Sequence, residues 1–211
     1  MIKFIIGADE AGRGCIAGHI FASATCFLDI KLMNLKFIDS KKMSKKQRQK
    51  QMLDIIDLKK FNIIDFTIAK RSPNDILIDG LGKCNKDIFI ESIDKLITNL
   101  HNKYGYNIKI EVIVDGNLKL LSIKYPNIIF NSVIKADNKF QEVSLASVIA
   151  KSSKDLEMSK LNKEYPNYNF NSHSGYDTKL HRECIIDYGV IKNVHREATK
   201  TIQRFLVNQG L

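Results

Sequence analysis

The chain opens with Met1-Ile-Lys-Phe-Ile-Ile-Gly-Ala-Asp9-Glu10-Ala-Gly12-Arg13-Gly14, the stretch around which the fold is organised. Its apolar run predicts a strand that leads to two adjacent carboxylates. Because neighbouring side chains of a strand point to opposite faces, Asp9 and Glu10 share one site only if the chain turns beyond them. Gly12 and Gly14 permit that turn, and they let the backbone approach a ligand closely. The pattern favours a divalent cation that meets phosphate about as strongly as it favours a strand followed by a loop with solvated charges.

The size and charge of the chain indicate one globular unit with an acidic partner. Its 211 residues suffice for one core, so we expect a single domain over 1–211 with a helical segment from about 176 to 211. Lys and Arg number 33 against 23 Asp and Glu, and this net charge of +10 favours a polyanion. Biased codon usage would explain a Lys-rich chain equally well.

The cysteines and the apolar segments indicate the compartment. Four cysteines at 15, 26, 84 and 184 lack CxxC or zinc-type spacing, which predicts free thiols in a reducing cytoplasm. The apolar start is too short for a signal peptide, and no segment is long enough to predict a membrane span. We therefore expect a cytoplasmic protein that makes no membrane contact.

The order of predicted elements indicates a mixed α/β sheet covered by helices. Strands are expected over 16–28, 62–69, 108–114 and 128–134, in addition to the first. Helices are expected from Ser44, which forms a capping-box pattern with Gln47, and from Ser72-Pro73. Further helices are expected over 83–100, 141–163, 180–188 and 194–206, and an aromatic, Asn-rich loop over 165–176.

Three aspartates lie at or just beyond predicted strand ends: Asp9, Asp115 and Asp137. Ligand sites of open α/β sheets gather at strand ends, so these residues are expected to converge, with Glu10 as a fourth carboxylate. Unpaired, they would repel one another, and a pair of Mg²⁺ or Mn²⁺ ions would relieve that repulsion. Singly, Asp137 is also explained as a helix N-cap and Asp115-Gly116-Asn117 as a turn. Together, in a basic chain, they favour metal chemistry.

Several motifs occur in the order of one known family. They are Ile6-Gly-Ala-Asp9-Glu10-Ala-Gly12-Arg13-Gly14 with Ala17-Gly18, Asp39-Ser40-Lys41-Lys42, Val114-Asp115-Gly116-Asn117, Lys135-Ala136-Asp137, Val143-Ser-Leu-Ala-Ser-Val-Ile-Ala-Lys151, His173-x-Gly175-Tyr176-x-Thr178-Lys179-x-His181 and His195-Arg196. Each is weak alone, but the ordered set is specific, and it resembles type 2 ribonuclease H (ribonuclease HII). Type 3 relatives carry an extra N-terminal domain, whereas the first motif here starts near residue 5, so type 2 is expected.

The resemblance implies a fold and a reaction. The fold would be a ribonuclease H-like mixed five-stranded sheet flanked by helices, with a helical C-terminal part. The reaction would be endonucleolytic cleavage of RNA paired with or joined to DNA, leaving a 3′-hydroxyl and a 5′-phosphate. The resemblance assigns metal binding and catalysis with two Mn²⁺ or Mg²⁺ ions to four carboxylates, Asp9, Glu10, Asp115 and Asp137.

The resemblance also implies how substrate is bound by a chain expected to act as a monomer. Gly12, Arg13 and Gly14 would read the 2′-hydroxyl and phosphate of a ribonucleotide, and Tyr176 would stack on the next sugar. Lys41 and Lys42 would contact backbone phosphates. The chain departs from the family in several places: Cys15 and His19 replace prolines, the usual Ser-Phe after His195-Arg196 is absent, and Ser174 and Asp177 replace a lysine and a glycine. The last two changes put substrate affinity beside Tyr176 in doubt.

Other polar residues have simpler interpretations. His173, His181 and His195 are expected to be hydrogen-bonded structural groups more often than substrate contacts. Lys151 and Asp155 are spaced as a surface pair, and the spacing of Arg196, Lys200 and Arg204 predicts a solvated stripe on the last helix. The aromatics of 165–170 are expected to pack under a loop. Two alternatives remain, an inactive or resolvase-like relative and a non-catalytic nucleic-acid-binding module, although four carboxylates would repel phosphates in such a module.

Overall fold

The computed structural model describes residues 2–29, 43–118 and 128–208. Lys41 and Lys42, which were expected to contact phosphates, lie outside these ranges. Among the described residues no helix is both long and apolar enough to span a membrane. All four cysteines are buried and free, as their spacing predicts.

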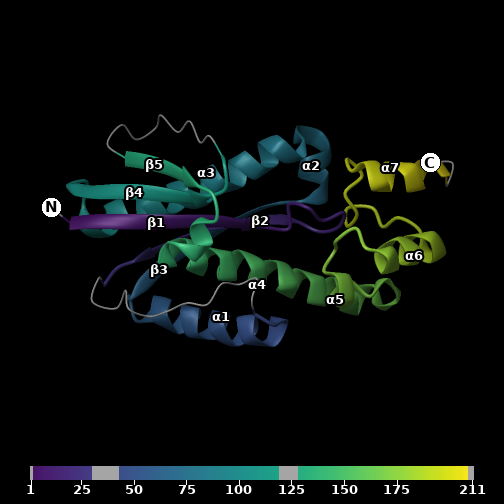
Figure 1. Cartoon of the computed structure of the whole chain (residues 1–211), viewed down its shortest axis with the longest axis horizontal. Coiled ribbons are helices and arrows are strands. Elements are labelled where there is room, and N and C mark those ends of the chain that lie inside the picture. The colour runs from purple at the N-terminus through teal and green to yellow at the C-terminus, as the bar shows by residue number, and fades with distance from the viewer. Residues whose placement is uncertain (1, 30–42, 119–127, 209–211) are drawn as a thin grey trace.

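Five strands form one mixed sheet in the order β3-β2-β1-β4-β5 (Figure 1). Their bounds are β1 Ile2–Ala11, β2 Ile20–Phe27, β3 Ile64–Arg71, β4 Ile108–Asp115 and β5 Ile128–Val133. β1 pairs antiparallel with β2 and parallel with β4, and β5 extends the parallel half. The predicted mixed sheet is confirmed. β2 starts at residue 20 instead of 16, because the backbone of residues 16–18 bonds to the C-terminal part of the chain instead of a strand.

Helices cover both faces of this sheet. α3 (Leu81–Tyr104) packs on one face, following α2 (Pro73–Asp79), and α1 (Lys45–Lys60) and α4 (Gln141–Glu164) pack on the other (Figure 1). The capping box predicted for α1 and the N-cap predicted for α2 are present, since Ser44 and Ser72 each accept a hydrogen bond from the third residue of their helix. These bonds satisfy backbone donors that helix starts leave open.

Gly7 sets how closely α4 approaches the sheet. A Cβ built at this position would lie 2.3 Å from the backbone of Glu142 and of Val143, a distance that no side chain tolerates. The absence of a side chain therefore lets the first turn of α4 rest directly on β1. This contact places Ser147, on the second turn of α4, within hydrogen-bond reach of the Asp9 carboxylate.

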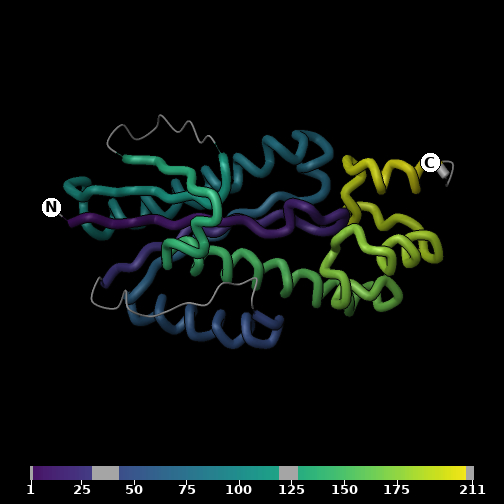
Figure 2. The backbone as a smooth tube through the Cα atoms, in the orientation of Figure 1, coloured from purple at the N-terminus to yellow at the C-terminus, as the bar shows by residue number. Residues whose placement is uncertain are grey.

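The C-terminal part lies beyond one end of the sheet, and the β1–β2 connection reaches it (Figure 2). It contains α6 (Lys179–Tyr188) and α7 (Lys200–Asn208) around its own apolar core. The expected loop over 165–176 is wrong, because this stretch forms the short helices η4 (Pro166–Tyr168) and α5 (Phe170–His173). The expected helix over 194–206 begins only at Lys200. Ala198 therefore lies outside the helix and is exposed, whereas Ile202 on α7 is buried.

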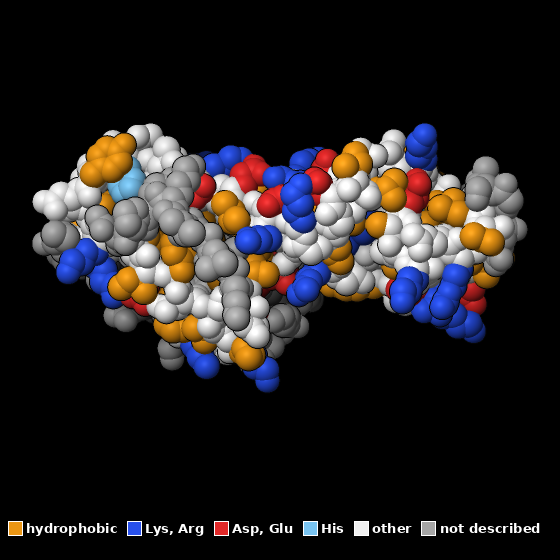
Figure 3. All heavy atoms as spheres, turned by 90° about the horizontal axis from the view of Figure 1, so that it is seen from above, with side chains coloured by type: hydrophobic (Ala, Val, Ile, Leu, Met, Phe, Trp, Pro, Cys, Tyr) orange, Lys and Arg blue, Asp and Glu red, His pale blue; other side chains and the backbone are white. Residues whose placement is uncertain are grey.

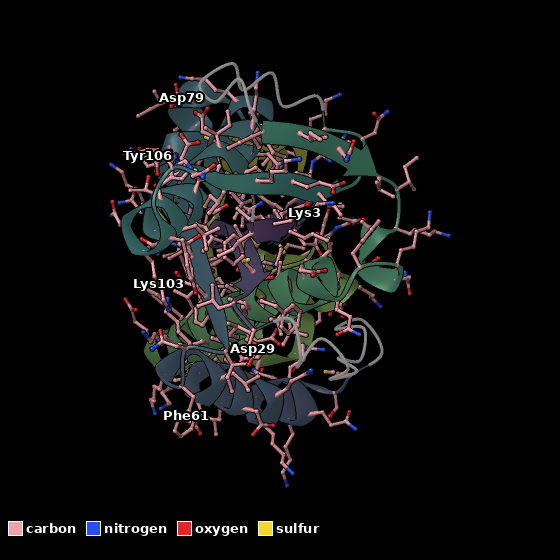
Figure 4. The ribbon with its side chains drawn as sticks, turned by 90° about the vertical axis from the view of Figure 1, so that its left-hand side faces the viewer. Lys3, Asp29, Phe61, Asp79, Lys103 and Tyr106 are labelled. Carbon is pink, nitrogen blue, oxygen red and sulfur yellow. The ribbon has the colours of Figure 1, made fainter. Side chains whose placement is uncertain are left out.

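Charged side chains lie near both ends of β1 and β4. Lys and Arg are spread along the length of the molecule on the face seen in Figure 3. At the end where β1 starts, Lys3 pairs with Glu111 of β4 at 2.8 Å between Nζ and Oε2 (Figure 4). The carboxylates singled out in the sequence lie toward the other end of the same strands.

Candidate metal centre and substrate-reading surface

The pairing of β1 with β4 brings Asp9 beside Asp115. Ala8 and Val114 are partners in the parallel ladder, so the following residue of each strand is an aspartate at the same level. Asp137 arrives from η3 (Ala136–Asn138), which follows β5. One carboxylate oxygen from each of the three lies within 4.8 Å of the others. The predicted convergence of strand-end aspartates is therefore present.

Backbone and side-chain donors orient these carboxylates. The Asp115 Oδ1 accepts the Ala136 N–H at 2.7 Å, which ties β4 to η3. The Asp9 Oδ1 accepts the Glu10 N–H at 2.7 Å, and the Asp137 Oδ1 accepts the Asn138 side-chain amide at 3.0 Å. Asp137 caps neither η3 nor α4, whose N-caps are Lys135 and Phe140. The simpler interpretation of Asp137 as a helix N-cap is thus wrong.

The centre carries more negative charge than its surroundings offset. Burial, together with the charges of Glu10 and Asp115, raises the pKa of Asp9 to about 8, although hydrogen bonds from Ser147 and from the Glu10 N–H lower it. Burial also raises the pKa of Glu10, although Arg13 lowers it. Carboxylate oxygens at this spacing are ligands that Mg²⁺ and Mn²⁺ prefer. The donor set therefore fits a hard divalent cation.

Glu10 stands beside the three aspartates and not within their group. Asp9 and Glu10 both lie inside β1, which continues to Ala11. On β2, Asp9 is paired with Ser23 and Glu10 with Ala22. The turn lies at Gly12, where the sequence predicts it and where φ is +87°, and both carboxylates precede it within the extended strand. Glu10 therefore interacts with the centre electrostatically: its charge raises the pKa of Asp9, and the charge of Asp115 raises the pKa of Glu10.

A loop and a tyrosine form the adjoining surface. Arg13 and Gly14 are exposed, and their N–H groups donate to no acceptor in the described parts of the chain. Cys15 forms an isolated β-bridge with Tyr176, whose side chain is 40% exposed. A Cβ built at Gly14 would meet only the Tyr176 ring, at an ordinary 3.9 Å. The fold thus tolerates a side chain at position 14, and its absence leaves room for a ligand between the loop and the ring.

Comparisons with known proteins give the family. The ribonuclease HII family model matches residues 6–205. A curated ribonuclease HII of Helicobacter pylori (strain G27) is 34% identical over 207 residues, which cover 96% of this chain and 94% of that protein. The chain belongs to the ribonuclease HII family. It is therefore a ribonuclease H enzyme, and the alternatives of a resolvase-like relative or a non-catalytic binding module are wrong.

Solved structures share the fold of this ribonuclease HII chain. The ribonuclease H2 of Pyrococcus horikoshii matches with a TM-score of 0.76 at 23% identity, covering 97% of this chain and 98% of that one. Bst-RNase HIII, solved in complex with Mn²⁺, matches with a TM-score of 0.76 at 17% identity, covering 97% and 70%. The expected ribonuclease H-like architecture with a helical C-terminal part is confirmed.

Two polar predictions outside the carboxylate centre of this ribonuclease HII chain are wrong. Arg196 is completely buried instead of lying on a solvated stripe, because it precedes α7, whereas Lys200 and Arg204 are exposed as expected. Asp155 is buried instead of forming a surface pair. Its Oδ2 accepts from the Arg48 Nε at 2.9 Å, and Lys151 is farther away at 3.7 Å.

The structure places Lys151 beside Tyr176, a position that the sequence alone did not indicate. Its Nζ lies 5.4 Å from the centre of the Tyr176 ring. The signal was present in the motif that ends at Lys151, four residues after Ser147 and hence one helical turn from the Asp9 contact. Asp177, expected to add an opposing charge, is held by Arg182 at 2.6 Å and by Thr201 at 2.7 Å. Its charge is therefore partly offset within the chain.

The aromatic and histidine residues of the C-terminal part pack as predicted. Tyr168 and Phe170 are buried and stack with ring centroids 5.7 Å apart. His173, His181 and His195 are buried as well, and both nitrogens of each ring have hydrogen-bond partners. The structural interpretation of these three histidines is thus supported by their contacts.

Proposed function

We propose that this chain is an endonuclease that hydrolyses the RNA strand of RNA/DNA hybrids and cuts on the 5′ side of ribonucleotides embedded in duplex DNA. The products would be a 3′-hydroxyl and a 5′-phosphate. The observation that carries this proposal is the position of three carboxylates, with one oxygen of each within 4.8 Å of the others, in a ribonuclease HII chain. A role in removing ribonucleotides from DNA, by a monomer in the cytoplasm, follows as part of the same proposal.

The carboxylates would hold two Mn²⁺ or Mg²⁺ ions. When bound, these ions would supply a hydroxide nucleophile and stabilise the charge on the leaving oxygen. Asp9, Asp115 and Asp137 would bind them directly, and Glu10 would complete the set from the adjacent position on β1. The raised pKa of Asp9 supports this role, because a buried carboxylate without a nearby cation is destabilised and gains most from a metal ion.

Arg13, Gly14 and Tyr176 form a surface, here called the substrate-reading surface, that would select the ribonucleotide. The N–H groups of Arg13 and Gly14, which donate to no described acceptor, are suited to a phosphate or to the oxygen of a 2′-hydroxyl. The exposed Tyr176 ring faces this loop and is suited to the flat side of the next sugar. A site that bonds a hydroxyl rejects the analogue lacking it by roughly 10⁴-fold or more, since buried polar groups are then left unpaired. Lys41 and Lys42 remain predicted phosphate contacts.

A cleavage assay tests this function. The substrate is a DNA duplex with one embedded ribonucleotide, labelled at the 5′ end, and the matched control is the same duplex with a deoxyribonucleotide at that position. With Mn²⁺ or Mg²⁺ we expect one cut 5′ of the ribonucleotide, and with a chelator no cut. Cleavage of the all-DNA duplex, or metal-independent cleavage, would contradict the proposal.

A further inference from the structure

His195 and Arg196 lie in the segment between α6 and α7, far along the chain from the metal centre. Both side chains are buried, with exposed fractions of 1% and 0%. The backbone of this pair is joined to the β1–β2 connection: Ala17 and His195 form an isolated bridge, and the Arg196 N–H donates to Ile16 O at 2.7 Å. The roles assigned so far to the carboxylates, the loop and Tyr176 include neither residue.

The Arg196 side chain is hydrogen-bonded to several backbone carbonyl groups of the β1–β2 connection. Its guanidinium donates to four backbone oxygens, at 2.7 to 3.2 Å, and these belong to Arg13, Cys15, Gly18 and His19. Lys154, equally buried, donates to Ala17 O at 2.8 Å. These bonds hold the loop's carbonyl oxygens against the buried cations, whereas the N–H groups of Arg13 and Gly14 donate to no described acceptor.

The His195 side chain leads to Tyr176 through His181. Its Nδ1 accepts the Ile191 N–H at 2.7 Å, so the ring proton lies on Nε2. That Nε2 lies 3.3 Å from the His181 Nε2, which must then accept, leaving the His181 proton on Nδ1. The His181 Nδ1–H donates to the backbone oxygen of Tyr176 at 2.8 Å. An amide donor at one end and a carbonyl acceptor at the other thus fix both tautomers.

His173 supports the same arrangement from the side. Its ring stacks on His181 with centroids 3.9 Å apart. Its Nδ1 accepts the Gly175 N–H at 3.1 Å, and its Nε2 donates to Tyr168 O at 2.7 Å, which fixes a third neutral tautomer. Burial lowers the pKa of all three histidines, consistent with rings that stay neutral in the folded chain.

We propose that His181, His195 and Arg196 are positioning residues for ribonucleotide recognition. Arg196 fixes the Arg13–Gly14 side of the substrate-reading surface, and the His195–His181 pair fixes the Tyr176 side. The proposal rests on the function proposed above for this surface. Apolar residues of similar volume often stabilise a core at least as well as buried polar groups do. The specific gain from this network is a fixed geometry between two segments that are about 160 residues apart in the chain.

Matched variants of His181 test the proposal. The side-chain amide of His181→Asn can replace the Nδ1–H that holds Tyr176, whereas the oxygen of His181→Gln can replace only the Nε2 that faces His195. The readout is kcat/KM on the single-ribonucleotide duplex divided by kcat/KM on a long RNA–DNA hybrid. Tyr176→Ala, which removes the ring itself, should lower this ratio and serves as the reference. We expect His181→Gln to lower the ratio about tenfold, toward the value of Tyr176→Ala, and His181→Asn to stay within about threefold of wild type.

The control is Glu183→Gln on the same helix, a half-exposed residue paired only with Lys179 among described residues, which should leave the ratio and the melting temperature unchanged. If His181 had a purely structural role, both variants would lose activity equally on the two substrates. That result would overturn the proposal. So would a ratio that stays at the wild-type value in His181→Gln.

A second measurement needs no change to the network. Nitrogen NMR of Asp115→Asn with isotope-labelled histidine should show His181 protonated on Nδ1, and His173 and His195 protonated on Nε2. Binding of the single-ribonucleotide duplex should shift the His181 signals, and the all-DNA duplex should shift them less. Other tautomers, or equal shifts with both duplexes, would overturn the proposal. The tautomers are read before any substrate is added, so a wild-type enzyme that fails to cleave would contradict the proposed function and not this network.

Discussion

The metal centre and the histidine–arginine network both bury polar groups, but they do so in opposite ways. Asp9, Asp115 and Asp137 bring like charges together with few donors, so the folded chain alone leaves the centre electrostatically unfavourable. Around His181 and Arg196, in contrast, donors meet acceptors within the chain. Under the proposed function a metal ion completes the first region, whereas folding alone completes the second. Chemistry is expected where the chain leaves groups unsatisfied, and rigidity where it satisfies them.

The largest effect should follow from weakening the metal centre without changing its shape. Asp115→Asn removes one charge and keeps an oxygen for the Ala136 N–H. We expect kcat/KM to fall about a thousandfold or more, equivalent to about 4 kcal/mol, with duplex binding retained. Cleavage rates measure the first effect and filter binding measures the second. Near-normal turnover would mean that Asp115 does not take part in metal binding.

Removing the Arg196 guanidinium from the network should destabilise the folded protein. Arg196→Met removes the guanidinium donor from four loop carbonyls, of which, among the described residues, only His19 O keeps a second donor, Lys154 Nζ at 3.4 Å, so we expect the free energy of unfolding to fall by about 3 kcal/mol or more. Urea unfolding measures this loss. The matched control is Arg204→Met on the exposed side of α7, expected to stay within about 0.5 kcal/mol of wild type. Equal losses in both variants would mean that the buried bonds do not stabilise the loop.

The metal centre should become more stable when a charge is removed from the metal-free protein. The folded pKa of Asp9, about 8, lies above its ordinary value of 3.8, so stability is fully present below about pH 4 and is lost as pH rises through 8. Asp9→Asn should therefore stabilise the metal-free chain at pH 8 by about 2 kcal/mol. Mn²⁺ should raise the melting temperature of wild type more at pH 8 than at pH 5. Thermal unfolding with and without a chelator decides this, and a destabilised Asp9→Asn would contradict it.

The network should show the opposite and smaller dependence on pH. Burial depresses the pKa of His181 to about 4 and of His195 to about 3, below the ordinary 6.5. The unfolded chain then binds protons that the folded chain does not, so stability is lost as pH falls from about 6.5 toward 4. In an Asp9→Asn background, which removes the opposing titration, His181→Asn should make this loss shallower by about 1 kcal/mol. Identical pH curves with and without His181 would contradict the assignment.

The metal centre could be predicted from the sequence because it depends on local patterns. Each aspartate follows an apolar run, and parallel strands bring their ends to one edge, so Asp9 and Asp115 meet once β1 pairs with β4. The capping residues Ser44 and Ser72 were predictable for the same reason, since each acts on its own helix.

The network could not be predicted because its contacts are not local. Helical spacing placed Arg196 on a stripe with Lys200, but the chain is irregular before α7, and partners in the β1–β2 connection draw the side chain inward. The spacing of Lys151 and Asp155 likewise gave no sign of Arg48, whose position 107 residues away decides which bond forms. The position of a buried charge depends on partners that come from elsewhere in the fold.

The separation of 178 positions between Gly18 and Arg196 also orders events during synthesis. All three aspartates of the centre are translated by residue 137, with Asp9 on β1, Asp115 on β4 and Asp137 on η3, whereas the loop gains its guanidinium only after residue 196 emerges. Contacts of such long sequence separation form late because loop closure must be completed first. The nascent chain therefore contains the three aspartates before it contains the guanidinium that holds the β1–β2 connection in place.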